Sequence, residues 1–174
     1  MLTIAVLVAV PVLALVAFAA TRPDIFHVRR STSIKAQPEK IFPLINDLHA
    51  FNNWNPFEKK DPNVKGTYSG PSSGKGARYG WDGNKYIGKG TIQIVESAPS
   101  SKVTMQLNFI KPFEAHNLVE FTLEPGGDST HVTWAMQGPL PFMAKIIHLF
   151  INMDRMVGKD FEAGLAYLKT IAEK

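Results

Sequence analysis

The middle of the chain, residues 64–138, constrains the fold most, because short segments of alternating apolar and polar residues follow one another there. Gly, Pro, Asn and Asp separate several of these segments, as in Asp82-Gly83-Asn84 and Pro125-Gly126-Gly127-Asp128. Such residues accept turn dihedrals. Short strands joined by short turns predict an antiparallel meander. The predicted strands are Val64–Ser69, Ala77–Trp81, Tyr86–Glu96, Lys102–Phe109, Ala115–Glu124 and Ser129–Gln137.

The segments on either side of the meander complete an α+β pattern. Phe26–Ile34 has the β-branched, alternating character of a strand, and Pro38 opens a short helix. A second short helix is expected to end at Pro56. From Pro141 to Ala172, apolar residues recur at three- and four-residue spacings, which predicts one long amphipathic helix. A curved antiparallel sheet wrapped around this C-terminal helix would bury one face of the sheet and the helix stripe together.

The N-terminal segment carries no charge from Leu2 to Ala20. This length matches the roughly 20 residues that a helix needs to cross a bilayer. We therefore predict an N-terminal transmembrane anchor over residues 1–22 and a folded domain over residues 24–174. A cleaved signal peptide is the alternative, since Ala17-Phe18-Ala19 resembles a cleavage site, but no Lys or Arg precedes the apolar run.

Basic residues follow the apolar run, where Arg22, Arg29 and Arg30 stand in the sequence. The positive-inside rule then favours a single-pass protein with a cytoplasmic domain. Signal cleavage would instead give an exported protein.

Composition excludes several classes of function. The chain has no Cys, which excludes disulfides, thiolate zinc sites and thiol nucleophiles. Its net charge of +4 comes from scattered Lys and Arg, which favours weak attraction to anionic surfaces and no nucleic-acid partner. The five His residues lack metal-ligand spacing, so we predict no metal and no cofactor.

One motif matches the sequence pattern around a catalytic serine, but the element predicted to follow it does not fit that pattern. Gly70-Pro71-Ser72-Ser73-Gly74 matches the G-x-S-x-G pattern of a nucleophile elbow. That elbow requires a helix after the serine, whereas a strand is predicted to follow here. We therefore interpret this segment as a loop and predict no catalytic residue.

Several local motifs, in this order of elements, resemble one superfamily. They are Trp54-Asn55-Pro56-Phe57, the run Gly76-Ala77-Arg78-Tyr79-Gly80-Trp81-Asp82-Gly83-Asn84, Pro112-Phe113-Glu114 and Thr133-Trp134-Ala135-Met136-Gln137-Gly138. From Asp24 to Lys174 the chain resembles the START-like or SRPBCC superfamily, within it the polyketide cyclase/dehydrase and lipid-transport group. The resemblance implies a helix-grip fold with an elongated cavity for an apolar small molecule or lipid. It does not imply one reaction.

The residues predicted to line this cavity come from the inward strand faces, the aromatic loop and the C-terminal helix. Tyr79, Trp81 and Asn117 would supply the few polar groups that orient a ligand, and Trp54 and Phe57 would stand at the mouth. An ordinary packed core is the alternative for each of them. The full set is Trp54, Phe57, Tyr79, Trp81, Met105, Leu107, Phe109, Asn117, Val119, Phe121, Trp134, Met136, Met143, Ile147 and Phe150.

These expectations predict a membrane-anchored domain that binds or transfers a hydrophobic small molecule or lipid, without intrinsic chemistry. A cyclase/dehydrase-like enzyme is one alternative, in which Tyr79, Asn117 or Asp82 polarises the substrate. It is disfavoured because no His or Glu is predicted to face inward. A stress-regulatory protein-interaction module without a ligand is the other, and a filled interior would favour it.

Overall fold

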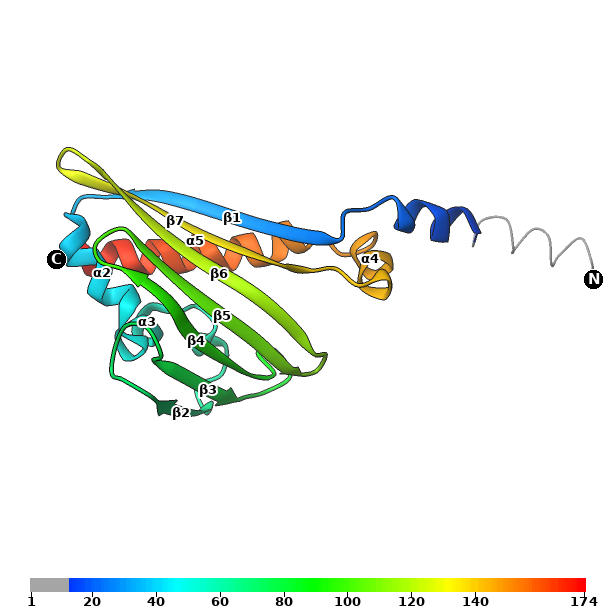
Figure 1. The fold of residues 1–174 in the computed structure, drawn as a ribbon, viewed down its shortest axis with the longest axis horizontal. Coiled ribbons are helices and arrows are strands. Elements are labelled where there is room, and N and C mark those ends of the chain that lie inside the picture. Colours follow the sequence, from blue (N-terminus) through cyan, green and yellow to red (C-terminus); the bar gives the residue numbers. More distant parts are fainter. Residues whose placement is uncertain (1–12) are drawn as a thin grey trace, which may run out of the picture.

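The computed structural model describes residues 13–174. Seven strands form one antiparallel sheet in the order β1-β7-β6-β5-β4-β3-β2, and the sheet curves along the C-terminal helix (Figure 1). The expected α+β helix-grip arrangement is confirmed for these residues. The strands are β1 (Ile25–Ile34), β2 (Lys65–Ser69), β3 (Arg78–Asp82), β4 (Lys89–Ala98), β5 (Lys102–Lys111), β6 (Ala115–Gly126) and β7 (Ser129–Pro139).

Two pairs of helices connect and follow the strands. Helices α2 (Pro38–Asn46) and α3 (Leu48–Trp54) and a 3₁₀ turn, η1 (Glu58–Lys60), lead from β1 to β2. Helices α4 (Phe142–His148) and α5 (Met153–Ala172) follow β7. Helix α5 lies along β1 on the concave side of the sheet (Figure 1).

The prediction of one continuous helix from Pro141 to Ala172 is wrong. The chain leaves the helical path after His148, and Asn152 caps a new helix by accepting a hydrogen bond from the Arg155 N–H at 2.8 Å. An N-cap of this kind satisfies a backbone donor that a continuing helix would have paired internally. Side-chain periodicity runs through the break because both helices are amphipathic, which is why the sequence pattern did not reveal it.

The strand predicted from Tyr86 begins three residues later, at Lys89. Asp61 explains the difference, because its carboxylate accepts hydrogen bonds from the backbone N–H groups of Asn84, at 2.7 Å, and Asn63, at 3.1 Å. This buried side chain holds the β3–β4 turn against the chain that follows η1. Tyr86 is left in the turn with its side chain 72% exposed.

An aromatic cluster fills the centre of the concave face. Trp134 stacks on Phe161 of α5 with ring centroids 4.1 Å apart, and Phe121 lies 4.9 Å from Trp134. Phe51 and Trp54 of α3 close the cluster edge-on. All five side chains are at most 3% exposed. The sheet, α3 and α5 therefore share one packed core.

Arg30 fixes the position of α5 along β1. Its guanidinium lies 2.9 Å from the Asp154 carboxylate and 2.7 Å from that of Glu162. Gly158 leaves space for this side chain, since a Cβ there would collide with the guanidinium. Exposed ion pairs of this kind contribute only about 0–1 kcal/mol each, so their main effect is on the orientation of the helix.

The predicted N-terminal anchor lies only partly within the described residues. Residues 1–12 of the apolar run lie outside the described residues, and residues 13–20 are helical. Within residues 13–174, no helix has both the length and the apolar character needed to cross a membrane. The anchor over residues 1–22 stays a prediction.

Candidate functional site

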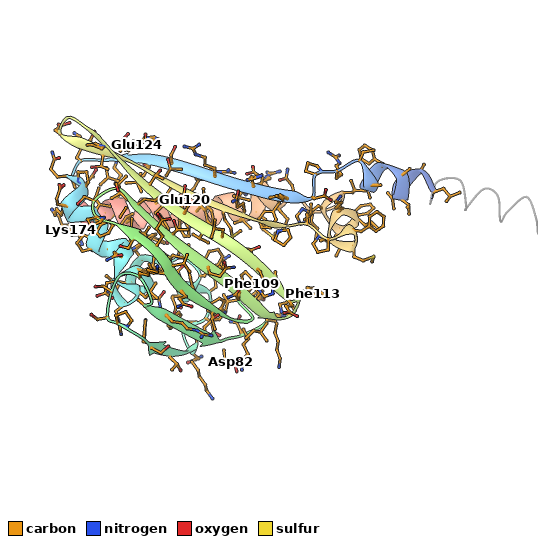
Figure 2. All side chains as sticks on the ribbon, viewed as in Figure 1. Asp82, Phe109, Phe113, Glu120, Glu124 and Lys174 are labelled. Atoms are coloured by element: carbon orange, nitrogen blue, oxygen red, sulfur yellow. The ribbon has the colours of Figure 1, made fainter. Side chains whose placement is uncertain are left out.

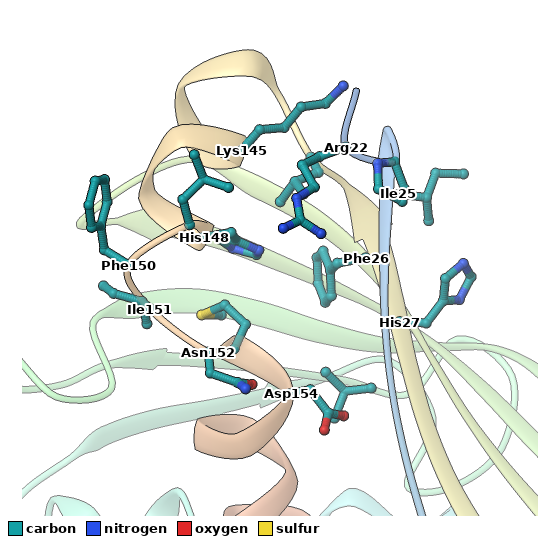
Figure 3. Close-up of a pocket in the computed structure, with 15 residues that line it drawn as sticks. Arg22, Ile25, Phe26, His27, Lys145, His148, Phe150, Ile151, Asn152 and Asp154 are labelled. Carbon is teal, nitrogen blue, oxygen red and sulfur yellow. The ribbon is translucent and has the colours of Figure 1, made fainter. Parts of the chain in front are cut away.

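A groove of about 540 Å³ lies between the start of β1 and the junction of α4 and α5 (Figure 3). Phe26, Leu149 and Met153 are among its apolar walls, and Arg22 and Asn152 are among its polar lining residues. The volume is within the range of about 300–1,000 Å³ found for small-molecule sites. Mostly apolar walls with a few polar groups suit a ligand that is itself largely apolar.

The groove exists because α4 is tied to the chain in front of β1. The Asp24 backbone carbonyl accepts a hydrogen bond from the Leu140 N–H at 2.7 Å. The Asp24 carboxylate also lies 2.7 Å from the Lys145 ammonium, whose side chain is only 8% exposed. These contacts hold α4 beside β1, while the break before Met153 directs α5 along the sheet. The space between the two helices and β1 is the groove.

His148 is one of two imidazoles that line this groove, the other being His27. His148 packs edge-on against Phe26, with ring centroids 6.3 Å apart (Figure 3). Burial lowers the pKa of His148 below its ordinary value. The imidazole is therefore neutral at pH 7, which keeps this wall of the groove uncharged and leaves one donor and one acceptor nitrogen.

A buried amide lies next to the groove wall. Asn117 is 5% exposed, and among the described residues its Oδ1 has no hydrogen-bond partner. This oxygen covers Gly138, and the Phe26 ring covers the same glycine, since a Cβ on Gly138 would meet both groups. A buried amide oxygen without a partner costs about 1–3 kcal/mol. The Asn117 amide therefore suits a water molecule or a polar ligand group that reaches behind Phe26.

The structure distributes the predicted cavity residues over three environments. Most are buried in the core, four are half-buried on the sheet or the loop after α3, and three are exposed on α4 or just after it. Among all of them, only Phe150 lines the groove. The buried set is Trp54, Tyr79, Met105, Asn117, Val119, Phe121, Trp134 and Met136; the half-buried set is Phe57, Trp81, Leu107 and Phe109; the exposed set is Met143, Ile147 and Phe150.

The expectation that Trp54 stands at an exposed mouth is wrong. Its side chain is 0% exposed, and its indole N–H donates a hydrogen bond to the Leu44 carbonyl at 2.8 Å. The Asn- and Pro-rich sequence around it suggested a loop, but α3 extends to Trp54 and turns the indole toward the sheet. Trp54 therefore fills the interior that the resemblance led us to expect as a cavity.

The structure also pairs two groups that the sequence did not connect. Glu58 of η1 lies near the hydroxyl of Tyr79 on β3, and a hydrogen bond between the two contributes to the pKa shift of each. Burial raises the pKa of Glu58, and the bond from Tyr79 partly opposes this shift. Burial and the nearby carboxylate raise the pKa of Tyr79, so its hydroxyl stays protonated. Because Glu58 precedes β2 in an irregular segment, periodicity gave no sign of this contact.

The Glu58–Tyr79 pair continues into a second group of polar and aromatic side chains. Tyr68 lies 4.7 Å from Tyr79 between ring centroids and stacks on His49 at 3.7 Å. Its hydroxyl accepts a hydrogen bond from the Asn52 amide at 2.9 Å. These contacts join η1 and α3 to the edge strands. Within the described part of the chain, no cluster of three or more His, Asp or Glu side chains could hold a metal ion.

Comparison with known proteins identifies one family. The family model described as "Polyketide cyclase / dehydrase and lipid transport" matches residues 26–173. No curated protein matches the sequence.

Solved structures with the same fold have low sequence identity to this chain. Protein MLL2253 from Mesorhizobium loti is 16% identical, with a TM-score of 0.61 over 83% of this chain and 95% of its own. Protein CV1439 from Chromobacterium violaceum is 13% identical, with a TM-score of 0.60 over 87% and 99%. The Aha1 dimer from Colwellia psychrerythraea is 19% identical, with a TM-score of 0.57 over 85% and 96%. Such distant matches establish the fold alone.

Proposed function

Because the chain belongs to the polyketide cyclase/dehydrase and lipid transport family, we propose that it binds a hydrophobic small molecule or lipid in the groove between β1 and α4–α5. The groove itself carries the proposal, because it offers about 540 Å³ of open space lined by nine apolar and six polar or charged residues. The unpaired oxygen of Asn117, behind Phe26, would orient a polar group of the ligand. No step of this proposal requires a reaction.

We further propose that the N-terminal apolar segment tethers this domain to a membrane, on its cytoplasmic side. Support comes from the uncharged run Leu2–Ala20 and the Arg residues that follow it. A tether would keep the groove close to the phase in which an apolar ligand dissolves, which raises its effective concentration without additional contacts.

Native mass spectrometry with lipid extraction tests ligand binding on the full-length chain, purified in detergent from the membranes of its own host. A wild-type protein that carries a stoichiometric apolar molecule would support the proposal. Ile151→Trp enlarges a groove-lining side chain that is 44% exposed, so it should lower occupancy without disturbing the core. Tyr86→Trp makes a similar exposed change away from the groove and should leave occupancy unchanged.

A wild-type protein that is empty and takes up no member of a lipid panel would contradict ligand binding. A protein-interaction module would then be the better function, since the aromatic cluster already fills the centre of the helix-grip fold. The exposed surfaces of the domain would then be the sites at which protein partners bind.

A further inference from the structure

The antiparallel register brings four connections to one end of the sheet. Ile25 at the start of β1 pairs with Pro139 at the end of β7, so the N-terminal segment and the β7–α4 connection leave together. Phe109 pairs with Ala115, and Lys89 pairs with Lys111, which places the β5–β6 and β3–β4 turns at the same end. We call this the N-terminal end.

Large exposed apolar side chains gather at the N-terminal end. Phe113 in the β5–β6 turn is 77% exposed and Ile110 beside it is 52% exposed. On α4 and the link to α5, Met143 is 67% exposed and Phe150 is 74% exposed. The full set is Ile25, Ile110, Phe113, Phe142, Met143, Ile147, Phe150 and Ile151, which we call the apolar end face. An exposed set of this size exceeds the scattered single residues that are normal on a soluble surface.

The opposite end of the sheet is polar. Figure 2 shows Phe113 at one end of the molecule and Glu124 and Lys174 at the other. The strand connections at that other end are the turns Pro99-Ser100-Ser101 and Gly127-Asp128 and the β2–β3 loop, residues 70–77. None of the residues in these three connections has a large apolar side chain. The apolar end face is thus a property of one end and not of the whole surface.

The apolar end face is held in place relative to the N-terminal segment. The contacts of Asp24 with Leu140 and Lys145 join α4 to the residues that precede β1. The segment of the chain before Asp24 therefore leaves the domain beside α4, as Figure 1 shows. In the sequence this segment contains the uncharged run Leu2–Ala20, of which the structure describes residues 13–20. Arg22 and Lys85 belong to the connections at this same end, and Lys111 ends β5 there. The acidic residues at this end are Asp24, Asp82 and Glu114, of which Asp24 is paired with Lys145 and Asp82 with Lys89.

We infer that the apolar end face lies in the interfacial layer of a lipid bilayer that contains anionic headgroups. A bilayer accounts for both features, because apolar side chains enter the acyl boundary while Arg and Lys remain among the headgroups. The inference rests on the proposed tether and deepens it. The groove borders this face through Ile25, Phe150 and Ile151. A ligand would then pass between bilayer and groove without crossing water.

The absence of Cys makes a direct test possible, since one introduced Cys is the only labelling site. Phe113→Cys and Met143→Cys place a polarity-sensitive fluorophore on the apolar end face, and Asp128→Cys places it at the polar end. The full-length variants are reconstituted into phosphatidylcholine vesicles with and without phosphatidylserine. Labels at 113 and 143 should emit at shorter wavelength than the label at 128. Brominated lipid should quench them several-fold more strongly.

A second pair of variants tests whether the side chains, and not the tether alone, make this contact. Phe113→Ser should weaken the lipid quenching of the label at 143. In the labelled protein that keeps Phe113, phosphatidylserine should strengthen this quenching. Tyr167→Ser removes an aromatic group that is 41% exposed on α5, away from the apolar end face, and should change neither the quenching nor its response to phosphatidylserine.

Two results would overturn the inference. One is a label at 113 and 143 that is as water-exposed as the label at 128. The other is shielding that depends on protein concentration and resists brominated lipid, which would mean that a second copy covers the face. Native mass spectrometry of the same samples separates this inference from ligand binding. An empty groove with a lipid-quenched face would contradict the proposed ligand and leave the docking face supported.

Discussion

Trp54→Phe tests whether the centre of the fold is a packed core and not a ligand cavity. Phe is smaller than Trp by three heavy atoms, which at about 0.8 kcal/mol per buried carbon group costs about 2 kcal/mol. The Leu44 carbonyl also loses the indole N–H that now lies 2.8 Å away, which adds about 1 kcal/mol. The free energy of unfolding should therefore fall by about 3 kcal/mol, a large part of the roughly 5–15 kcal/mol that stabilises a typical domain.

Urea unfolding of the full-length protein in non-ionic detergent, followed by far-UV circular dichroism, measures this change. With a slope of about 2 kcal/mol per molar urea, the midpoint should fall by about 1.5 M. Trp81→Phe is the matched control, because its indole N–H also donates to a backbone carbonyl, that of Ile87 at 3.0 Å, but its ring is only half-buried. Its midpoint should fall less. Equal midpoints for the two variants, or no change for Trp54→Phe, would refute a core role for Trp54.

Three further variants test other contacts. Gly164→Ala should lower the melting temperature, because the new Cβ would lie 2.7 Å from the Trp134 ring and 2.9 Å from Pro56. Overpacking of this kind costs about 1–3 kcal/mol, which outweighs the gain of about 1 kcal/mol from the helix preference of Ala. Gly158→Ala would displace the Arg30 guanidinium from Asp154 and Glu162, but these exposed ion pairs contribute only about 0–1 kcal/mol each and the helix preference of Ala offsets their loss. Its melting temperature should therefore fall less than that of Gly164→Ala, and equal losses in both would contradict this account. The raised pKa of Glu58 means that the folded state binds the Glu58 proton more tightly than the unfolded state does. Glu58 therefore lowers the free energy of unfolding as pH rises from the ordinary pKa of a Glu side chain through the raised pKa of Glu58. Glu58→Gln removes this titration and keeps an acceptor near Tyr79, so the urea midpoint should fall less as pH rises above 4.5, the ordinary pKa of the Glu side chain. An unchanged pH dependence would assign the effect to other groups. Asn117→Leu should raise the urea midpoint of the ligand-free protein and lower ligand occupancy in native mass spectra, because it removes a buried amide oxygen without a partner; a lower midpoint would show that this amide is satisfied.

The sequence allowed the local elements to be predicted well. Alternation in Val103, Met105 and Leu107 identified β5 and its inward face, because side chains of a strand point to opposite sides in turn. Turn residues such as Pro125-Gly126-Gly127 marked the strand ends, because their backbones accept dihedrals that strands exclude. The resemblance to the SRPBCC group was confirmed by the family match over residues 26–173.

The candidate site was less accessible to prediction. Phe150 and Trp54 were both assigned to a cavity, yet Phe150 is 74% exposed and Trp54 is 0% exposed. Apolar periodicity shows which side chains share a face, but it does not show what covers that face. For Trp54 the cover is the sheet, through Phe121 and Trp134. For α4, the part of the chain that the structure describes provides no such cover for Met143 and Phe150.

By itself, the sequence determined the order of the seven strands, the two short helices after β1, the inward faces of the strands and an uncharged N-terminal run, since each depends on residues near one another in the chain. The tertiary structure alone decided that aromatic side chains fill the centre, and that a groove opens where α4 breaks from α5. It also decided that Asp24 holds α4 beside β1, through Lys145, which is 121 residues further along the chain. These features depend on contacts between distant segments, and such contacts arise only when the whole sheet closes around α5.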